Sequence, residues 1–321
     1  MDRRTFVSTL MAGIVALPAL PALTAVSAPA SAAEVKAKPD QKFALLMSHM
    51  DNEFTIQLSG AVQQKAKEVG AQLTVFDARN EIARQIGQVE TAVTQGYTGL
   101  LIEPVAVDGV GPALQAAKKA GLAVVTIDQK ITHQELVDAY VGANPVQGGE
   151  MEMEFIAKAI KGAGNVAFLL GPLGSDAELG RTQGYQNVIK DKYPDIKVVY
   201  QQTANWRTDQ ALTLVENWLQ TGTPLAAIVA NNDDMALGAV KAVKDAGQVG
   251  KTLIIGLDAT PNGLAAVKEG SMIATLSQST TDQGLLAMET VVRVANGEKV
   301  QPEIYVPHTL ITKENVAQFQ K

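Results

Sequence analysis

The chain contains no cysteine, and only 5% of its residues are aromatic. Without cysteine there can be no disulfide bond, thiol nucleophile, thiolate metal site or lipidated N-terminal cysteine. Basic residues are also the minority, with 27 Lys and Arg against 33 Asp and Glu, and they form no basic tract. A net charge of −6 without such a tract argues against nucleic acid as a partner.

Several functional motifs are also missing. No predicted strand is followed by G-x-G-x-x-G or by a P-loop, so a nucleotide cofactor is not expected. The three histidines, His49, His133 and His308, lack the spacing of metal ligands. We find no helix-turn-helix segment, which argues against a transcriptional regulator. The sequence therefore predicts neither a cofactor nor a metal site.

The first 32 residues are expected to form a signal peptide. Arg3 and Arg4 precede an apolar run to about Ala25, and residues 28–33, APASAA, offer a small-residue cleavage site. The arginine pair followed by x-Phe favours the twin-arginine export route, with an ordinary secretory signal as the alternative. We therefore expect an exported, periplasmic protein that begins near Ala33.

The remaining length and the 46% hydrophobic content are sufficient for about two globular domains. Short apolar runs alternate with segments of helical periodicity throughout. Such alternation predicts parallel sheets with helical crossovers. In the first half the predicted strands are Phe43–Met47, Leu73–Phe76, Gly99–Ile102 and Ala123–Ile127, and the helices between them are Thr55–Val69, Ile82–Thr94 and Val110–Ala120.

The pattern restarts after a short extended piece, Tyr140–Val141, so two Rossmann-like halves meet near Gly142–Asn144. Thr260 is expected to cap a helix that has Pro261 at its first position. The tail Ile304–Ile311 is predicted to be extended, with a last helix from Thr312. The other strands of the second half are predicted at Val166–Leu170, Val198–Tyr200, Ala226–Ala230, Leu253–Leu257 and Ile273–Leu276, and the other helices at Val146–Ile160, Glu178–Lys190, Thr208–Gln220 and Thr281–Ala295.

The stretch Leu225–Val243 shows where a ligand site could lie in this alternation of strands and helices. A buried strand ends in Asn231-Asn232-Asp233-Asp234, and a helix follows. Ligands of open α/β sheets bind at the carboxyl ends of strands. The same residues could instead cap the helix and complement its dipole. Both interpretations stay open from this stretch alone.

Polar residues follow most of the other strands as well. Because parallel strands end at one edge, these residues are expected to line one crevice between the two halves. Carboxylates and amides suit a ligand rich in hydroxyl groups. Trp206, in a polar loop, is expected to stack on a sugar ring, whereas Trp218 is expected in the core. The run Glu150–Glu154, which also holds Met151 and Met153, is expected to be a buried helix edge with solvated carboxylates.

The blocks NNDDMALGA at 231–239 and GLDATPNG at 256–263, with the loop Ser48–Phe54, resemble the periplasmic ribose-binding-protein family of ABC importers. The resemblance covers essentially the whole chain after the signal peptide. It implies the type I periplasmic binding protein fold, with two α/β lobes joined by a three-strand hinge. The crossings would lie near Gly142–Asn144, Ser277–Thr281 and Tyr305–His308. The predicted lobes are residues 33–142 plus 280–306, and 143–279 plus 307–321.

The resemblance also implies a binding site and its partners. Three site positions depart from ribose binders, with Glu103 in place of Asn, Gln129 in place of Arg and Trp206 in place of Phe. Residues 179–185 and 202–218 look more like the inositol-binding branch. We therefore expect a monomer that delivers a sugar or cyclitol, inositol rather than ribose, to an ABC permease. The implied ligand contacts are Ser48, Asn52, Phe54, Glu103, Asp128, Gln129, Arg181, Trp206, Asn232, Asp258 and Gln278.

Two other function classes stay open from the sequence. A periplasmic hydrolase could use paired carboxylates such as Glu103 and Asp258. A sugar receptor for chemotaxis would bind the same ligand but pass the signal to another membrane partner. The resemblance favours a protein that releases its ligand unaltered, and no catalytic residue is predicted.

Overall fold

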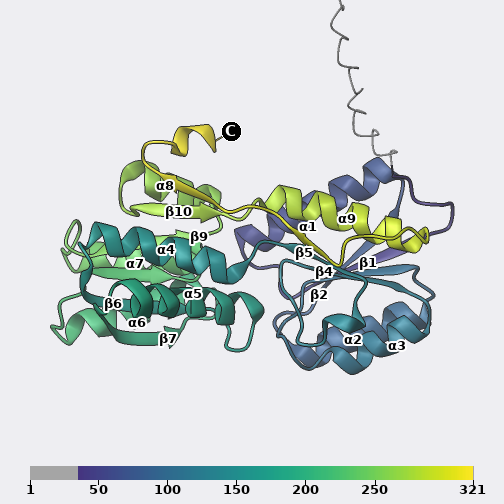
Figure 1. Ribbon diagram of the computed structural model, residues 1–321, viewed down its shortest axis with the longest axis horizontal. Coiled ribbons are helices and arrows are strands. Elements are labelled where there is room, and N and C mark those ends of the chain that lie inside the picture. Colours follow the sequence, from purple (N-terminus) through teal and green to yellow (C-terminus); the bar gives the residue numbers. More distant parts are fainter. Residues whose placement is uncertain (1–34, 321) are drawn as a thin grey trace, which may run out of the picture. The chain divides into compact units, whose positions relative to one another are not determined.

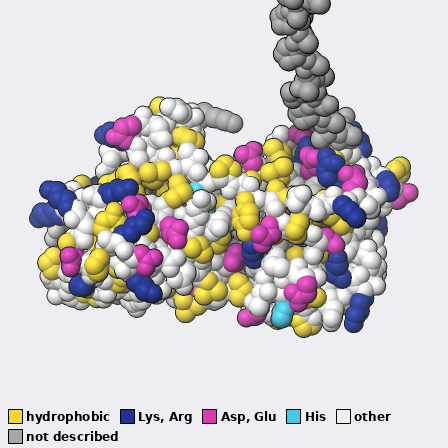
Figure 2. Space-filling view, viewed as in Figure 1, with side chains coloured by type: hydrophobic (Ala, Val, Ile, Leu, Met, Phe, Trp, Pro, Cys, Tyr) yellow, Lys and Arg dark blue, Asp and Glu magenta, His cyan; other side chains and the backbone are white. Residues whose placement is uncertain are grey.

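The computed structural model describes residues 35–320, which form two six-stranded sheets with helices on both faces of each (Figure 1). The predicted signal peptide, including the arginine pair that favours the twin-arginine route, lies outside these residues. Within residues 35–320, no helix combines the length and the apolar character that a membrane crossing needs. Figure 2 shows acidic and basic side chains interspersed over the visible face.

The first sheet has the strand order β11-β5-β4-β3-β1-β2, and all of its pairs are parallel. Helices α1 and α9 bury apolar side chains against one face, and α2 and α3 bury theirs against the other. A 3-10 turn, η1, covers Gln134–Leu136. The bounds are β1 Lys42–Met47, α1 Glu53–Val69, β2 Gln72–Asp77, α2 Ile82–Thr94, β3 Gly99–Ile102, α3 Gly111–Lys119, β4 Ala123–Ile127, β5 Ala139–Gly142, α9 Thr280–Ala295 and β11 Glu303–Tyr305.

The second sheet has the order β12-β10-β9-β8-β6-β7, and only β12 is antiparallel to its neighbour. Helices α4 and α5 cover one face, whereas α6, α7 and α8 cover the other. The bounds are α4 Pro145–Ala159, β6 Ala163–Leu170, α5 Asp176–Lys192, β7 Asp195–Thr203, α6 Thr208–Gln220, β8 Ala227–Ala230, α7 Asp233–Asp245, β9 Leu253–Leu257, α8 Pro261–Glu269, β10 Ala274–Ser277 and β12 Thr309–Thr312. The predicted fold class, two lobes with mainly parallel sheets, is confirmed.

The chain passes from one sheet to the other in three short segments. These are residues 143–144 between β5 and α4, residues 278–279 between β10 and α9, and residues 306–308 between β11 and β12. His308 Nε2 lies 2.9 Å from the carbonyl oxygen of Asn144, so two of the segments are in contact. Each lobe is therefore built from separate parts of the sequence.

Local signals explain where several helices begin. Asn232 caps α7, and its side chain accepts a hydrogen bond from the N–H of Met235 at 3.0 Å. Thr260 caps α8 as predicted, with Pro261 at the first helical position. Asp233 is fully buried and accepts hydrogen bonds from the N–H of Thr260 and the hydroxyl of Thr275, at 2.9 and 2.7 Å. Asp233 therefore ties three elements together instead of facing a ligand.

The end of the chain differs from the sequence-based prediction. Thr312 closes strand β12, which pairs with β10, and the only helical structure after it within the described residues is the 3-10 turn η2, Val316–Gln318. The predicted helix from Thr312 is wrong because the N–H of Thr312 is held by the Asn315 side chain at 2.8 Å, which forms a turn.

Candidate functional site

One cavity of about 280 Å³ of empty space gathers side chains from the strand ends of both sheets. It brings together ten of the eleven residues predicted to contact a ligand. Ser48 is the exception: it is buried and hydrogen-bonded to the lining residues Glu103 and His49. Sequence reasoning missed two residues, His49 and Ala177. The full lining is His49, Asn52, Phe54, Glu103, Asp128, Gln129, Ala177, Arg181, Trp206, Asn232, Asp258 and Gln278.

The backbone at this edge is unusual. Asp128 follows β4, Trp206 follows β7 and Asp258 follows β9, and their φ angles are 63°, 62° and 134°. Residues other than glycine seldom have positive φ, because the side chain then crowds the main chain. Such conformations cluster at binding and active sites, where neighbouring structure holds them in place. The strained strand ends therefore support this edge as a functional site.

The cavity is acidic. It contains the carboxyl groups of Glu103, Asp128 and Asp258, each with 7% or less of its surface exposed. Burial, with the nearby Asp128 as a second cause, raises the pKa of Glu103 to about 8. Burial likewise raises the pKa of Asp128 to about 6, although Arg181 opposes this shift. Burial is also the main cause that raises the pKa of Asp258 well above its usual range.

Arg181, on α5, is the only arginine or lysine among the described residues that line this cavity. Its guanidinium donates to the carbonyl oxygen of Asn231 at 2.5 Å and to Gln278 Oε1 at 3.3 Å. Arg181 Nη1 also lies 4.0 Å from Asp258 Oδ1. Gln278 in turn donates from Nε2 to Asp258 Oδ1 at 2.7 Å. These contacts hold the guanidinium and the Asp258 carboxylate in fixed positions beside the cavity.

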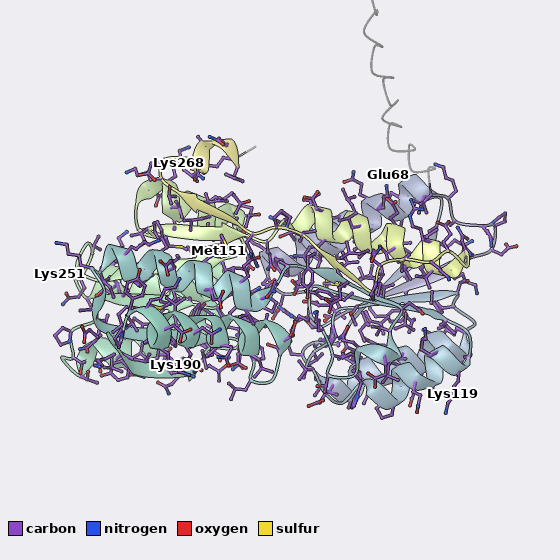
Figure 3. All side chains as sticks on the ribbon, in the orientation of Figure 1. Glu68, Lys119, Met151, Lys190, Lys251 and Lys268 are labelled. Atoms are coloured by element: carbon purple, nitrogen blue, oxygen red, sulfur yellow. The ribbon has the colours of Figure 1, made fainter. Side chains whose placement is uncertain are left out.

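A second buried layer supports Arg181 from behind. The hydroxyl of Tyr185 donates to Glu152 Oε2 at 2.7 Å and accepts from Asn231 Nδ2 at 3.2 Å. The expectation that all carboxylates of the run 150–154 are solvated is wrong for Glu152, which is fully buried with a pKa raised by burial to about 8. Met151, labelled on α4 in Figure 3, is half-buried against the core. Neither periodicity nor spacing in the sequence distinguishes Glu152 from its neighbours.

His49 and Asn52 form a neutral pair at the end of β1. His49 Nδ1 lies 2.8 Å from the hydroxyl of Ser48, and Nε2 lies 3.0 Å from Asn52 Nδ2. An amide nitrogen only donates, so the imidazole accepts at Nε2 and carries its proton on Nδ1. Burial lowers the pKa of His49, in agreement with a neutral ring. Asn52 Oδ1 also caps α1 through the N–H of Thr55.

Trp206 lines the cavity but is also part of the hydrophobic core. Only 7% of its surface is exposed, compared with 3% for Trp218. The Arg181 guanidinium lies 5.8 Å from the centre of the Trp206 ring, within range of a cation–π contact. Trp218 instead stacks on Tyr200 with ring centres 5.3 Å apart and donates to Gln202. The predicted core position of Trp218 is confirmed, whereas Trp206 combines core packing with a wall of the cavity.

We expect Trp206→Phe to lower both stability and ligand affinity. The loss of buried indole surface should cost about 1–2 kcal/mol of unfolding free energy, within the usual range for a single substitution. Affinity should fall by up to about tenfold, because one wall of the cavity recedes. Trp218→Phe is the matched control and should cost similar stability without a change in affinity. Denaturant unfolding and calorimetric titration measure the two effects. If both variants bind as wild type does, Trp206 has no role beyond packing.

Hydrogen bonds close the lobes over the cavity. The N–H of Lys130, after β4, donates to Asp176 Oδ2 at 3.0 Å, and the N–H of Val107 donates to the carbonyl oxygen of Gly174 at 3.0 Å. A further hydrogen bond joins the lobes between α8 and α1, where Asn262 Nδ2 donates to Glu53 Oε1 at 2.6 Å. These hydrogen bonds join the two lobes to each other. Within residues 35–320, no group of His, Asp and Glu side chains is arranged to hold a metal ion.

Comparison with known proteins agrees with this architecture. The ribose import binding protein of Bacillus subtilis is 34% identical over 277 residues, which is 86% of this chain and 89% of that protein. The xylitol-binding protein of Mycolicibacterium smegmatis is 32% identical, over 89% of this chain and 81% of its own length.

Among solved structures, a solute-binding protein of an ABC transporter from Bacillus halodurans, crystallised with myo-inositol, superposes with a TM-score of 0.84 at 30% identity. The match covers 90% of this chain and 99% of that one. Residues 43–299 match the family model described as a periplasmic binding protein domain. The two parallel-sheet lobes, the shared cavity and these matches together show that the chain belongs to the periplasmic binding protein family.

Proposed function

We propose that this protein is the exported substrate-binding component of an ABC importer and that it carries one monosaccharide or cyclitol to a membrane permease. The observation that supports this most is the convergence of strand-end carboxyl, amide and guanidinium groups on one cavity. Each ligand hydroxyl is both a donor and an acceptor, so a polyol needs partners of both kinds. Asp258, Gln278 and Arg181 supply both kinds within one connected set of contacts.

The size and walls of the cavity suit a single ring. The cavity is small, and its empty space of about 280 Å³ includes open solvent at its mouth. Phe54 and Trp206 supply apolar walls for the C–H faces of a saturated ring. The relatives named above bind ribose, xylitol and myo-inositol, which share several adjacent hydroxyl groups. Glu103 and Gln129 depart from the ribose-binder pattern, and we therefore favour a cyclitol over ribose.

Binding without chemistry is the simpler function for this cavity. Lining residues such as Asn232 and Gln278 are almost wholly buried, so a bound ring would be enclosed by both lobes. A hydrolase that uses Glu103 and Asp258 would also need room for a leaving group and a water molecule. The cavity is small, and part of its empty space is open solvent at its mouth. We therefore propose a binding protein that releases its ligand unaltered.

A thermal-shift screen of the mature protein against pentoses, hexoses, pentitols and inositols tests this function. A ligand at about 100 times its dissociation constant should stabilise the protein by roughly 2.7 kcal/mol. The ligand recovered after denaturation should be chemically unchanged by mass spectrometry and chromatography. If no polyol stabilises the protein, or if a glycoside of the best ligand is hydrolysed on incubation with it, the proposed function is wrong.

A further inference from the structure

The loop that follows β4, residues 128–130, supplies two side chains to the cavity, those of Asp128 and Gln129. Asp128 has a φ of 63°, in the left-handed region. Such a backbone costs energy for a residue other than glycine, and it persists only where neighbouring groups hold it. The groups that hold this loop are therefore candidates for residues that set the position of the ligand contacts.

The first of these groups is the hydroxyl of Tyr140, on β5. Tyr140 is fully buried, and its side chain lies so close to Gly142 that a Cβ at that position would be 2.2 Å from the hydroxyl oxygen. The hydroxyl donates to the carbonyl oxygen of Ala143 at 2.7 Å and to that of Asp128 at 3.1 Å. A hydroxyl has one hydrogen, so Tyr140 shares it between the loop and the first segment that joins the lobes.

The second group is the side chain of Lys130. Its ammonium donates to Glu303 Oε1 and to the hydroxyl of Tyr305, both at 2.6 Å and both on β11. The ammonium also lies 4.8 Å from the centre of the Tyr140 ring and 5.0 Å from that of Tyr305, within range of cation–π contacts. Because β11 leads directly into residues 306–308, Lys130 connects the loop to another segment that joins the lobes.

The loop is thus held at both of its ends. The Asp128 carbonyl is bonded to Tyr140, and the Lys130 ammonium is bonded to β11. The rings of Tyr140 and Tyr305 are also in edge-to-face contact, with centres 5.7 Å apart. The N–H of Lys130 donates in addition to Asp176 of the second lobe. These contacts hold the loop without the use of any cavity-facing side chain of the loop.

We propose that Tyr140 and Lys130 are positioning residues for ligand binding, which fix the loop 128–130 so that Asp128 and Gln129 meet the ligand. Both side chains lie outside the cavity lining. The proposal rests on the proposed function, because it assumes that the cavity binds a ligand. It goes further in that ligand affinity should depend on two side chains that do not touch the ligand.

Hydrogen exchange of the ligand-free protein tests the positioning itself. Tyr140→Phe removes one oxygen atom and should make the backbone N–H groups of residues 128–130 exchange about tenfold faster, because the loop then opens more often. Tyr97→Phe is the matched control. Tyr97 lies in the same lobe and donates to the hydroxyl of Thr74 at 3.0 Å, so its loss should leave exchange in the loop unchanged.

Lys130→Met is the second variant, in case Tyr140→Phe does not fold. It keeps the backbone N–H and the aliphatic stem but removes the bonds to β11, so exchange in the loop should again rise. Lys118→Met is its control, because Lys118 pairs with Asp138 in the same lobe and its side chain is 32% exposed, compared with 22% for Lys130.

Calorimetric titration measures the effect on binding, with whichever of ribose, xylitol and myo-inositol gives the largest thermal shift. Tyr140→Phe should weaken binding about tenfold, the equivalent in affinity of one buried hydrogen bond. Its effect should depend on Asp128. In an Asp128→Asn background, which keeps a residue that tolerates positive φ, Tyr140→Phe should cost about twofold or less. In a Trp206→Phe background, which alters the opposite lobe, it should cost the full tenfold.

The outcomes separate this inference from the proposed function. Unchanged exchange in the loop of both Tyr140→Phe and Lys130→Met overturns the inference, whatever the protein binds. If exchange rises but a polyol binds both variants as it binds wild type, the inference is wrong and the polyol-binding protein stands. Equal losses in the Asp128→Asn and Trp206→Phe backgrounds would mean that Tyr140 contributes general stability and does not act through Asp128. If no polyol binds the wild-type protein, the proposed function and the inference fail together.

Discussion

Replacing Asp258 with alanine is expected to weaken ligand binding by about a hundredfold or more. Asp258 is 5% exposed at the end of β9 and faces the cavity. Gln278 occupies one of its oxygens and Arg181 lies 4.0 Å away, which leaves acceptor positions for ligand hydroxyls. A buried hydroxyl left without its partner costs roughly 1–3 kcal/mol. Two such losses amount to roughly 2–6 kcal/mol, a range that includes the about 2.8 kcal/mol that corresponds to a hundredfold in affinity.

Calorimetric titration with the polyol that gives the largest thermal shift measures this effect. Asp258→Asn is the companion variant, because it keeps the side-chain volume while it removes the charge and replaces one acceptor oxygen with an NH2 donor. Asp209→Ala is the control, since Asp209 lies on the same lobe with 68% of its side chain exposed, and its one ion pair within the described residues is with Arg207. An Asp258→Ala protein that binds within threefold of wild type would show that Asp258 is merely a turn residue.

Replacing Arg181 with methionine is expected to lower the free energy of unfolding by about 3–5 kcal/mol at pH 8, the usual cost of removing one partner from a buried ion pair. Arg181 is 4% exposed and lies within charge range of Asp128 and Asp258. Methionine keeps most of the side-chain volume, so the loss should come mainly from the charge and its hydrogen bonds. Denaturant unfolding of the ligand-free protein measures this difference.

The cost of Arg181→Met should depend on pH with a definite sign. Arg181 stabilises ionised carboxylates, and the pKa of Asp128 is about 6 while that of Asp258 is raised well above its usual range. Below about pH 6 Asp128 is largely protonated in the folded protein, so Arg181 has less negative charge to offset. The cost should therefore be at least about 1 kcal/mol smaller at pH 5 than at pH 8.

Arg207→Met serves as the control for this measurement. Arg207 is half exposed and pairs with Asp209 and Asp51 at the surface. Exposed ion pairs contribute about 0–1 kcal/mol, so this variant should change stability little at either pH. Equal losses for Arg181→Met at pH 5 and pH 8 would mean that packing, and not charge compensation, is the main contribution of Arg181.

The sequence by itself determined the α/β architecture of this protein. Apolar runs of strand length alternate with helical periodicity, and that order leaves few arrangements other than parallel sheets with crossovers. The caps at Asn232 and Thr260 were readable because their signals lie within four residues of the helix start. The cavity-lining residues were also predictable in type and place, because parallel strands bring their carboxyl ends to one edge.

The tertiary structure alone decided which polar residues turn inward and what they contact. In the run 231–234, Asn232 lines the cavity while Asp233 is buried among Thr260 and Thr275 from other elements. Glu152 is buried because Tyr185, 33 residues later, donates to it. The dual role of Trp206 likewise arises between segments far apart in the chain. Local patterns report periodicity and caps, whereas burial and charge pairing depend on partners that only the folded chain brings together.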